Sequence, residues 1–267
     1  MKKDNNSGKL VFSPKDLVNF YESKYVSWMD RQYLENPGET KPDDPDIVMK
    51  LLAEKGNLHE ATVLKDLRQA GKTVADLTDK NETETLKAMK EGFDVIFQGS
   101  LSSRDFRGFS DFLIKVEGKS DLGEYHYEVW DTKLARNPKG KFVIQLCMYS
   151  EIVGELQGRR PEYTVIKPGR GDDTRLRLDD YWEFYQYTKS QFFEFQNSFD
   201  STQPPDPQDY GEYGRWKSIA QAQLLEEDAL IQVANLRREQ AIHLRNFNID
   251  TMTKLAEAKD DISVPRI

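Results

Sequence analysis

The spacing of apolar residues in the first third of the chain is helical. Ser13 is a good N-cap and Pro14 suits a first helical position, so a helix is expected from 14 to about 34. A loop rich in proline and aspartate follows at 36–46. Further helices are expected at 46–54, 57–70 and 82–91, with Gly71 and Gly92 after the last two.

The middle of the chain has the shorter period of strands. Runs rich in β-branched and aromatic residues predict strands at 93–97, 106–116 and 125–131, the last two joined by a turn at 118–123. An amphipathic helix at 142–156, a strand at 163–166 and a helix at 178–199 complete this part. The order is helix, three strands, helix, strand, which predicts an α/β fold with an αβββαβ core.

A proline-rich break at 204–207 is the best candidate for a domain boundary, since the pattern beyond it is almost purely helical. Helices are expected there at 216–245 and 251–258. We therefore expect a core with N-terminal helices at 1–203 and a helical C-terminal extension at 204–267.

Composition narrows the class of protein. Hydrophobic residues, Met and Cys included, make up 37% of the chain, enough for a packed core, and no apolar run approaches the roughly 18 residues of a membrane span. The start lacks the apolar stretch of a signal peptide, and Cys147 is the sole cysteine. These features favour a cytoplasmic protein with no membrane partner and no internal disulfide.

The charge balance weighs against a broad basic surface for nucleic acid. The chain has 38 Lys and Arg against 46 Asp and Glu, a net charge of −8. Cations nevertheless gather locally at Lys133, Arg136, Lys139 and Lys141. Clustered carboxylates would also suit a metal-dependent enzyme, because a bound cation inverts the local field.

Two of the predicted strands carry candidate chemistry at their ends. Asp111 lies near the end of one, and Asp131 and Lys133 end the next. Because side chains alternate along a strand, Asp131 and Lys133 share a face and Glu128 points to the opposite one. A carboxylate pair can hold a hard cation beside the lysine, but an ordinary exposed ion pair would look the same.

The order of these motifs resembles a known superfamily. Gly108-x-x-Asp111, Asp131-x-Lys133 on a strand and Gln145-x-x-x-Tyr149 on a helix are similar to the PD-(D/E)xK nucleases, and to their RecB-like branch in particular. An upstream His59-Glu60 pair on a helix fits that branch. Segments 13–18 and 230–240 resemble one RecB-like subfamily, in which the nuclease often precedes a helicase.

The resemblance implies a site and its metal. Asp111, Asp131, Glu60 and the backbone carbonyl of Thr132 would hold Mg²⁺ or Mn²⁺, with His59 as a further candidate ligand. Lys133 would orient the attacking water or stabilise charge in the transition state, and Gln145, Tyr149 and Arg136 would contact the substrate.

Simpler interpretations remain open for three of these residues. A first-turn Glu60 also interacts favourably with a helix dipole. Gln145 and Tyr149 could be the polar edge of a helix and a core tyrosine.

The chain departs from the branch in its cysteines. Many RecB-like relatives bind an iron–sulfur cluster through four cysteines. This chain has one cysteine, Cys147, and so cannot supply them. The early cysteine position corresponds to Ser23, and the late ones fall near Tyr210, Tyr213 and Trp216. We expect no iron–sulfur cluster, and we expect these aromatic residues to join the two ends instead.

Together these observations predict a metal-dependent DNA nuclease acting in DNA repair, recombination or defence, with a helicase in cis or in trans. The alternatives are a catalytically weak DNA-binding or scaffolding module and a protein-interaction domain. Cleavage mode, polarity and strand preference are not determined by the sequence.

Overall fold

The computed structural model describes residues 1–4 and 7–258 and contains both helices and strands, so the α/β class is confirmed. Its strands are β1 (Lys2–Lys3), β2 (Leu10–Val11), β3 (Val74–Asp76), β4 (Val95–Ser102), β5 (Arg107–Ser120), β6 (Gly123–Lys133), β7 (Tyr163–Pro168) and β8 (Thr174–Arg177). Its α-helices are α1 (Pro14–Glu22), α2 (Lys24–Glu35), α3 (Ile47–Gln69), α4 (Glu82–Glu91), α5 (Gly140–Gln157), α6 (Asp179–Asn197), α7 (Lys217–Glu226), α8 (Arg238–Asn246) and α9 (Met252–Glu257).

Internal contacts divide the chain into two compact units. The first comprises residues 1–18 and 45–197, and the second comprises 19–44 with the chain from Ser198 onward. The sequence-based boundary at 203/204 rests on a proline cluster and on the helical pattern beyond it. Local pattern gave no reason to group 19–44 with the C-terminal part, because that grouping depends on tertiary contacts.

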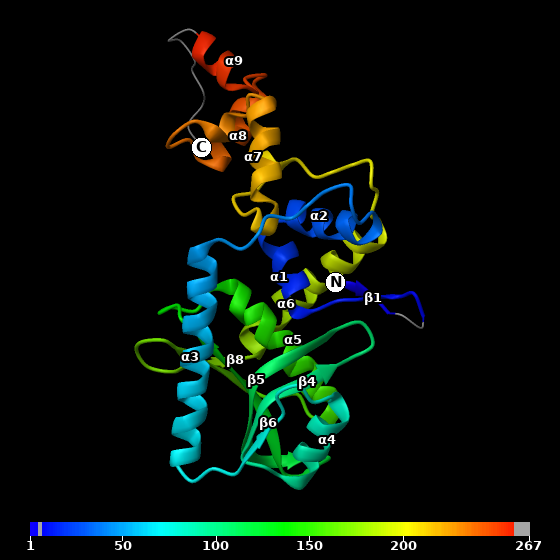
Figure 1. Cartoon of the computed structure of the whole chain (residues 1–267), viewed down its shortest axis with the longest axis vertical. Helices are drawn as coiled ribbons and strands as arrows, with labels where there is room; N and C mark the ends of the chain where they lie inside the picture. Colours follow the sequence, from blue (N-terminus) through cyan, green and yellow to red (C-terminus); the bar gives the residue numbers. More distant parts are fainter. Residues whose placement is uncertain (5–6, 259–267) are drawn as a thin grey trace. The chain divides into compact units, whose positions relative to one another are not determined.

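The first unit is built on a mixed six-stranded sheet in the order β3-β4-β5-β6-β7-β8. The central strands β4, β5 and β6 are antiparallel neighbours, while β3 runs parallel to β4 and β7 parallel to β6. The edge strands β3 and β8, which the sequence pattern did not predict, complete the sheet. Along the chain, the helix α4 is followed by β4, β5 and β6, then by the helix α5 and the strand β7, and these four strands are the middle of the sheet (Figure 1).

Helices cover the sheet according to the parity of its strands. Val63 and Leu64 of α3 pack with Val95, Phe112 and Ile114 on one face. Leu113 and Val129, which point the other way, are fully buried, and α5 contacts β4 and β6. Tyr185 of α6 donates a 2.6 Å hydrogen bond to Glu151 of α5, which ties the two helices together.

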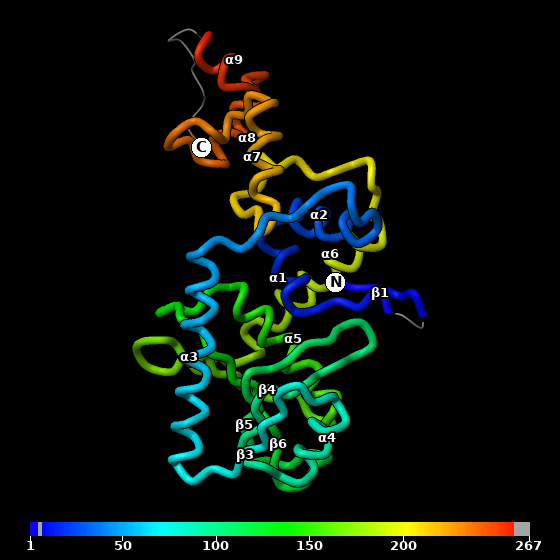
Figure 2. The backbone as a smooth tube through the Cα atoms, in the orientation of Figure 1, coloured from blue at the N-terminus to red at the C-terminus, as the bar shows by residue number. Residues whose placement is uncertain are grey.

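Several predicted helix boundaries were wrong. The helix expected at 14–34 is two helices, because Ser23 accepts a hydrogen bond from the Val26 N–H and caps α2. The two helices expected at 46–54 and 57–70 are one, α3, which continues through Gly56 (Figure 2). A mid-helix glycine costs only about 1 kcal/mol relative to alanine, so packing of the later turns can outweigh it.

The second unit joins α2 to the chain beyond Ser198. The buried carboxylate of Asp30 accepts 2.9 Å hydrogen bonds from Trp216 Nε1 and Arg215 Nε. Tyr213 packs edge-on against Tyr25, with ring centroids 6.1 Å apart. The prediction that Tyr213 and Trp216 join the two ends is confirmed, while Tyr210 acts locally by accepting a hydrogen bond from the Tyr213 hydroxyl.

The long helix predicted at 216–245 is wrong. Its place is taken by α7, α8 and the single-turn helices η2 (Gly214–Trp216) and η3 (Leu230–Gln232); a further turn, η1, lies at Pro207–Asp209. Leu230 is buried with Ala241 and Leu244 in a small core of its own. Within the described residues, no helix is both long and apolar enough to cross a membrane.

Candidate active site

Three polar residues lie in a row across the central strands of the sheet. In the β4–β5 ladder Phe97 pairs with Phe112 and Gly99 with Ser110, which places Gln98 opposite Asp111. In the β5–β6 ladder Phe112 pairs with Trp130, and one further step places Asp111 opposite Asp131. The two aspartates are neighbours, because the charge of Asp111 raises the pKa of Asp131.

Asp131 is the most deeply buried carboxylate in this row, with 2% of its surface exposed. Burial first and then the charge of the neighbouring Asp111 raise the pKa of Asp131 to about 7, although Lys133 opposes the shift. The Lys133 ammonium lies 2.5 Å from Oδ2, although no residue that the structure describes donates a well-directed hydrogen bond to that oxygen. Asp131 and Lys133 therefore share a face, as strand parity predicted, and form a close ion pair.

Asp111 is held by the strand next to it. Its Oδ2 accepts hydrogen bonds from the Thr132 backbone N–H at 2.8 Å and from the Thr132 hydroxyl at 2.9 Å. These bonds replace the ladder bonds that end at Phe112 and Trp130. The sequence implied a role only for the Thr132 carbonyl, which stays a prediction. The structure adds that the N–H and hydroxyl of the same residue position Asp111.

Glu60 approaches the row from α3. Gln98 Nε2 donates a short hydrogen bond to Glu60 Oε1. Burial and then the charge of Asp111 raise the pKa of Glu60, while Gln98, Lys133 and His59 oppose the shift. The half-buried Glu60 is thus electrostatically part of the Asp111 group. Its expected place in a first helical turn was wrong, because α3 begins at Ile47 and Glu60 lies in its middle, where a helix-dipole role does not apply.

Gln98 itself has an unusual backbone. Its φ of 53° lies in the left-handed region, which is rare for a non-glycine residue inside a strand. Such strain costs roughly 1–3 kcal/mol and is common at functional sites. Sequence reasoning missed Gln98, and no local signal marks it, because its importance comes from facing Asp111 and Glu60.

His59 contacts strand β7 through one ring nitrogen. Its Nε2 lies 3.1 Å from the backbone oxygen of Lys167 on β7, so that nitrogen carries the proton and donates. In this arrangement His59 fastens α3 to β7. A role as a metal ligand stays a prediction and could use only Nδ1.

Gln145 and Tyr149 of α5 complete the polar group. Gln145 Nε2 makes a long contact of 3.5 Å with Asp131 Oδ1. Burial, then Asp111 and Asp131, raises the pKa of the Tyr149 phenol, while hydrogen bonds with Gln145 and the Phe109 backbone oppose the shift. A Cβ at Gly108 would lie 2.9 Å from Tyr149 Oη, so the glycine admits the phenol. The Gly108, Asp111, Gln145 and Tyr149 motifs therefore meet in space.

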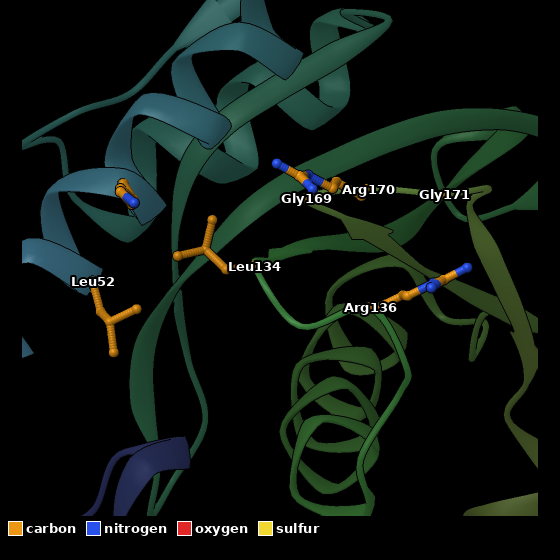
Figure 3. Close-up of a pocket in the computed structure, with 7 residues that line it drawn as sticks. Leu52, Leu134, Arg136, Gly169, Arg170 and Gly171 are labelled. Carbon is orange, nitrogen blue, oxygen red and sulfur yellow. The ribbon is translucent and has the colours of Figure 1, made fainter.

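Two other candidates lie apart from this group. Glu128 points to the opposite face, where Arg175 of β8 lies 3.4 Å away; burial raises its pKa and Arg175 opposes the shift. Arg136 is exposed in the loop after β6 and lines a groove (Figure 3). No contact between Arg136 and the carboxylates appears in the described part of the chain.

The three carboxylates do not stand in a finished metal geometry. Among residues 1–4 and 7–258, no group of three or more His, Cys, Asp or Glu side chains is placed to hold a metal ion. Oxygens of Glu60, Asp111 and Asp131 instead face Gln98, Thr132 and Lys133, respectively. The charge of Asp111 nevertheless raises the pKa values of Glu60 and Asp131, and all the atoms that the three carboxylates could offer to a cation are oxygens.

Comparisons with known proteins add little to this geometry. No family model matches the chain, and no curated protein matches it. A solved structure described as the crystal structure of SSO0001 aligns with 74% of this chain and 80% of its own, at 16% identity and a TM-score of 0.29. That similarity is too weak to support an argument about function.

Proposed function

We propose that this chain is a divalent-metal-dependent deoxyribonuclease of the PD-(D/E)xK type, in its RecB-like branch. The observation that carries the proposal is the opposition of Asp111 and Asp131 on adjacent strands, one of them almost fully buried. Two like charges in one buried place are costly unless protons or a cation compensate them. A raised carboxylate pKa in such a cluster is typical of functional sites.

The arrangement of elements supports the same family. The αβββαβ order that the family implies is present as α3 or α4, then β4, β5, β6, α5 and β7. The motif residues lie at one end of β5 and β6 and on the facing side of α5. Fold alone does not identify a reaction, so the proposal rests on the site within it.

The residues present fit a hard divalent cation. Asp111, Asp131 and Glu60, with the Thr132 carbonyl, would hold Mg²⁺ or Mn²⁺, both of which prefer oxygen ligands. The buried Oδ2 of Asp131, which lacks a well-directed donor, is one such ligand. To coordinate, Glu60 would give up its bond from Gln98 and Asp131 its close approach to Lys133.

Each protein group then has a distinct task. When bound, the cation supplies a water of lowered pKa and a Lewis acid for the phosphodiester. Lys133, freed from Asp131, places a positive charge beside the attacked phosphate and stabilises the charge that develops on it. Gln145 and Tyr149 orient the scissile strand from α5, and the bonds from Thr132 keep Asp111 in place.

The proposed biological setting follows from the resemblance. The chain would act on DNA in repair, recombination or defence, with a helicase delivering the substrate in cis or in trans. A net charge of −8 suits such delivery, because general affinity for DNA would be weak.

The proposal is tested by measuring metal binding and cleavage together. Wild-type protein should bind Mn²⁺ in calorimetry and should cut labelled linear DNA only when Mn²⁺ or Mg²⁺ is present. Asp131→Asn should lose both properties. The matched control is Glu128→Gln, which neutralises a buried acid on the other face of the same strand and should keep both.

Two outcomes would contradict the proposal. If Asp131→Asn bound Mn²⁺ as tightly as wild type, Asp131 would not be a metal ligand and the proposed metal site would be disproved. Wild-type protein that binds DNA but cuts neither single- nor double-stranded substrate with any divalent metal would favour the scaffolding alternative.

A further inference from the structure

The two halves of the long helix α3 have different surroundings (Figure 1). In its later turns, Val63 and Leu64 are buried against the sheet. In its earlier turns the large apolar side chains face solvent: Ile47 is 85% exposed, Leu58 69% and Leu51 48%. Single exposed apolar residues are common, whereas several on one surface mark a site of interaction with another protein. All of α3 belongs to the first unit.

Three of these residues form a stripe on the side of α3 that faces away from the sheet. Successive helical residues are about 100° apart, so Ile47, Leu51 and Leu58 lie within about 40° of one another. Leu67, nine residues after Leu58 and therefore about 180° around the helix, packs against the core of the sheet. The sheet that covers Leu67 therefore cannot cover this α3 stripe, which is about 16 Å long.

Two opposite charges lie at the centre of the α3 stripe. Glu54 and Lys55 fall midway between Leu51 and Leu58 in the sequence, and both are exposed. Neither forms an ion pair with any residue that the structure describes. Each is within about 60° of Leu51 around the helix, so both side chains border the stripe. The surface is thus apolar at its two ends and carries one charge of each sign in its middle.

The pattern of the α3 stripe is complementary to itself. When a second α3 lies antiparallel about a twofold axis between Glu54 and Lys55, Glu54 of each copy faces Lys55 of the other. The same axis places Leu51 of each copy opposite Leu58 of the other. A parallel pair in register would instead bring Glu54 to Glu54 and Lys55 to Lys55, and like charges repel.

The ends of the stripe agree with the same axis. Ile47 of one copy falls opposite Thr62 of the other. The Thr62 hydroxyl already donates a 2.8 Å hydrogen bond to the Leu58 carbonyl, so an apolar neighbour leaves no unpaired hydroxyl proton there. A partner of a single charge sign would repel either Glu54 or Lys55, whereas the same helix turned around supplies the reversed order of charges.

We propose that the α3 stripe is the contact surface of an antiparallel homodimer, in which the occupant of the stripe is α3 of a second copy of this chain. The inference does not depend on the proposed nuclease function. Glu60 lies nine residues after Leu51 and about 180° around the helix, so pairing leaves the candidate active site uncovered. An interface of one helix pair is small, which makes the dimer a weak one that forms at micromolar concentrations.

Sedimentation velocity would measure the dimer. Wild-type protein should shift from monomer toward dimer between about 1 and 100 µM, and Leu51→Glu with Leu58→Glu should stay monomeric over that range. The matched control is Tyr187→Glu with Leu225→Glu, which makes the same change at exposed apolar residues outside α3 and should dimerise as wild type does. Circular dichroism would verify that all three proteins are folded.

Charge reversal tests the pairing of Glu54 with Lys55. Glu54→Lys alone and Lys55→Glu alone should each weaken the dimer by roughly tenfold, because both symmetry-related contacts become repulsive. An equimolar mixture of the two variants should form a heterodimer of wild-type strength. The double variant Glu54→Lys with Lys55→Glu should also recover, since the opposite charges again face each other.

Cysteine cross-linking tests the orientation. Leu51→Cys mixed with Leu58→Cys should form a disulfide-linked dimer under mild oxidation. Either variant alone should not, because the two copies of residue 51 lie about 10 Å apart along the antiparallel helices, too far for a disulfide. The native Cys147 is buried and does not compete.

The contrary results are equally clear. Wild-type protein that is monomeric at every concentration would overturn the inference, as would a dimer that survives Leu51→Glu with Leu58→Glu. Single charge variants that dimerise as tightly as wild type, or Leu51→Cys that cross-links to itself, would refute the antiparallel pairing. If DNA cleavage is absent and the dimer forms as described, the nuclease proposal fails and the assignment of the α3 stripe stands.

Discussion

Asp111 is fixed by Thr132, whose backbone N–H and hydroxyl both donate to the same carboxylate oxygen, at 2.8 and 2.9 Å. The backbone pairing of β5 with β6 ends at Phe112 and Trp130. Beyond that point the Asp111 side chain, and not a backbone carbonyl, accepts the hydrogen bond from the Thr132 N–H. As a result Asp111 stays opposite the buried Asp131 despite their like charges.

The role of Lys133 can be separated from that of the metal ligands. Lys133→Ala should leave Mn²⁺ affinity roughly unchanged, since an ammonium cannot ligate a cation. DNA cleavage should fall by about 10²–10³, the usual cost of losing one stabiliser of transition-state charge. Calorimetry and a cleavage assay on the same preparation would measure both, and cleavage at the wild-type rate would refute the assigned role.

Metal-free protein should show a pH dependence that comes from Asp131. Its pKa rises from 3.8 to about 7 on folding, so between these values the folded state binds more protons than the unfolded state. The contribution of Asp131 to the free energy of unfolding therefore falls as pH rises through this interval. Melting temperatures in EDTA from pH 4.5 to 7.5 should decline less for Asp131→Asn than for wild type; parallel profiles would disprove the shift.

Gly108 should resist substitution because of Tyr149. In Gly108→Ala the new Cβ would lie 2.9 Å from Tyr149 Oη and 3.0 Å from Pro14 Cδ, so the buried phenol must move. Both melting temperature and DNA cleavage should fall. Gly56→Ala is the control, because nothing lies within 4 Å of its added Cβ, and it should stabilise α3 by roughly 0.5–1 kcal/mol.

Gln98 offers a test of strain at the site. Gln98→Gly accepts a positive φ without steric cost, so stability should be kept or should rise. The variant loses the amide that bonds Glu60, so Mn²⁺ affinity should change. Thermal denaturation and calorimetry would measure the two effects. Lower stability with unaltered Mn²⁺ affinity would mean that Gln98 serves only the fold.

In the second unit, Asp30 should matter for stability. Asp30→Ala leaves the buried Trp216 N–H without its acceptor and releases Arg215, so the free energy of unfolding should fall by about 1–3 kcal/mol. Urea denaturation followed by tryptophan fluorescence would measure the change. Asp44→Ala, at an exposed loop position, should be near neutral; an equal loss in both variants would contradict the assigned role of Asp30.

The sequence by itself determined the central strands, the helix that became α5 and the faces of the strands. Strand parity placed Asp131 beside Lys133 and away from Glu128, since alternation is a property of every extended backbone. Helical spacing placed Gln145 and Tyr149 on one face of α5, because residues four apart lie on the same side of a helix. The order of the central strands followed from their turns, because short connections favour neighbouring strands.

Tertiary structure alone decided which distant residues meet. The short edge strands β3 and β8 have too few residues for a period, and they form because an adjacent strand offers hydrogen bonds. The role of Gln98 and the union of α2 with Trp216 depend on contacts between segments far apart in the chain. Local propensity reports the conformation of a few consecutive residues, whereas these sites arise from burial and charge that only the packed chain creates.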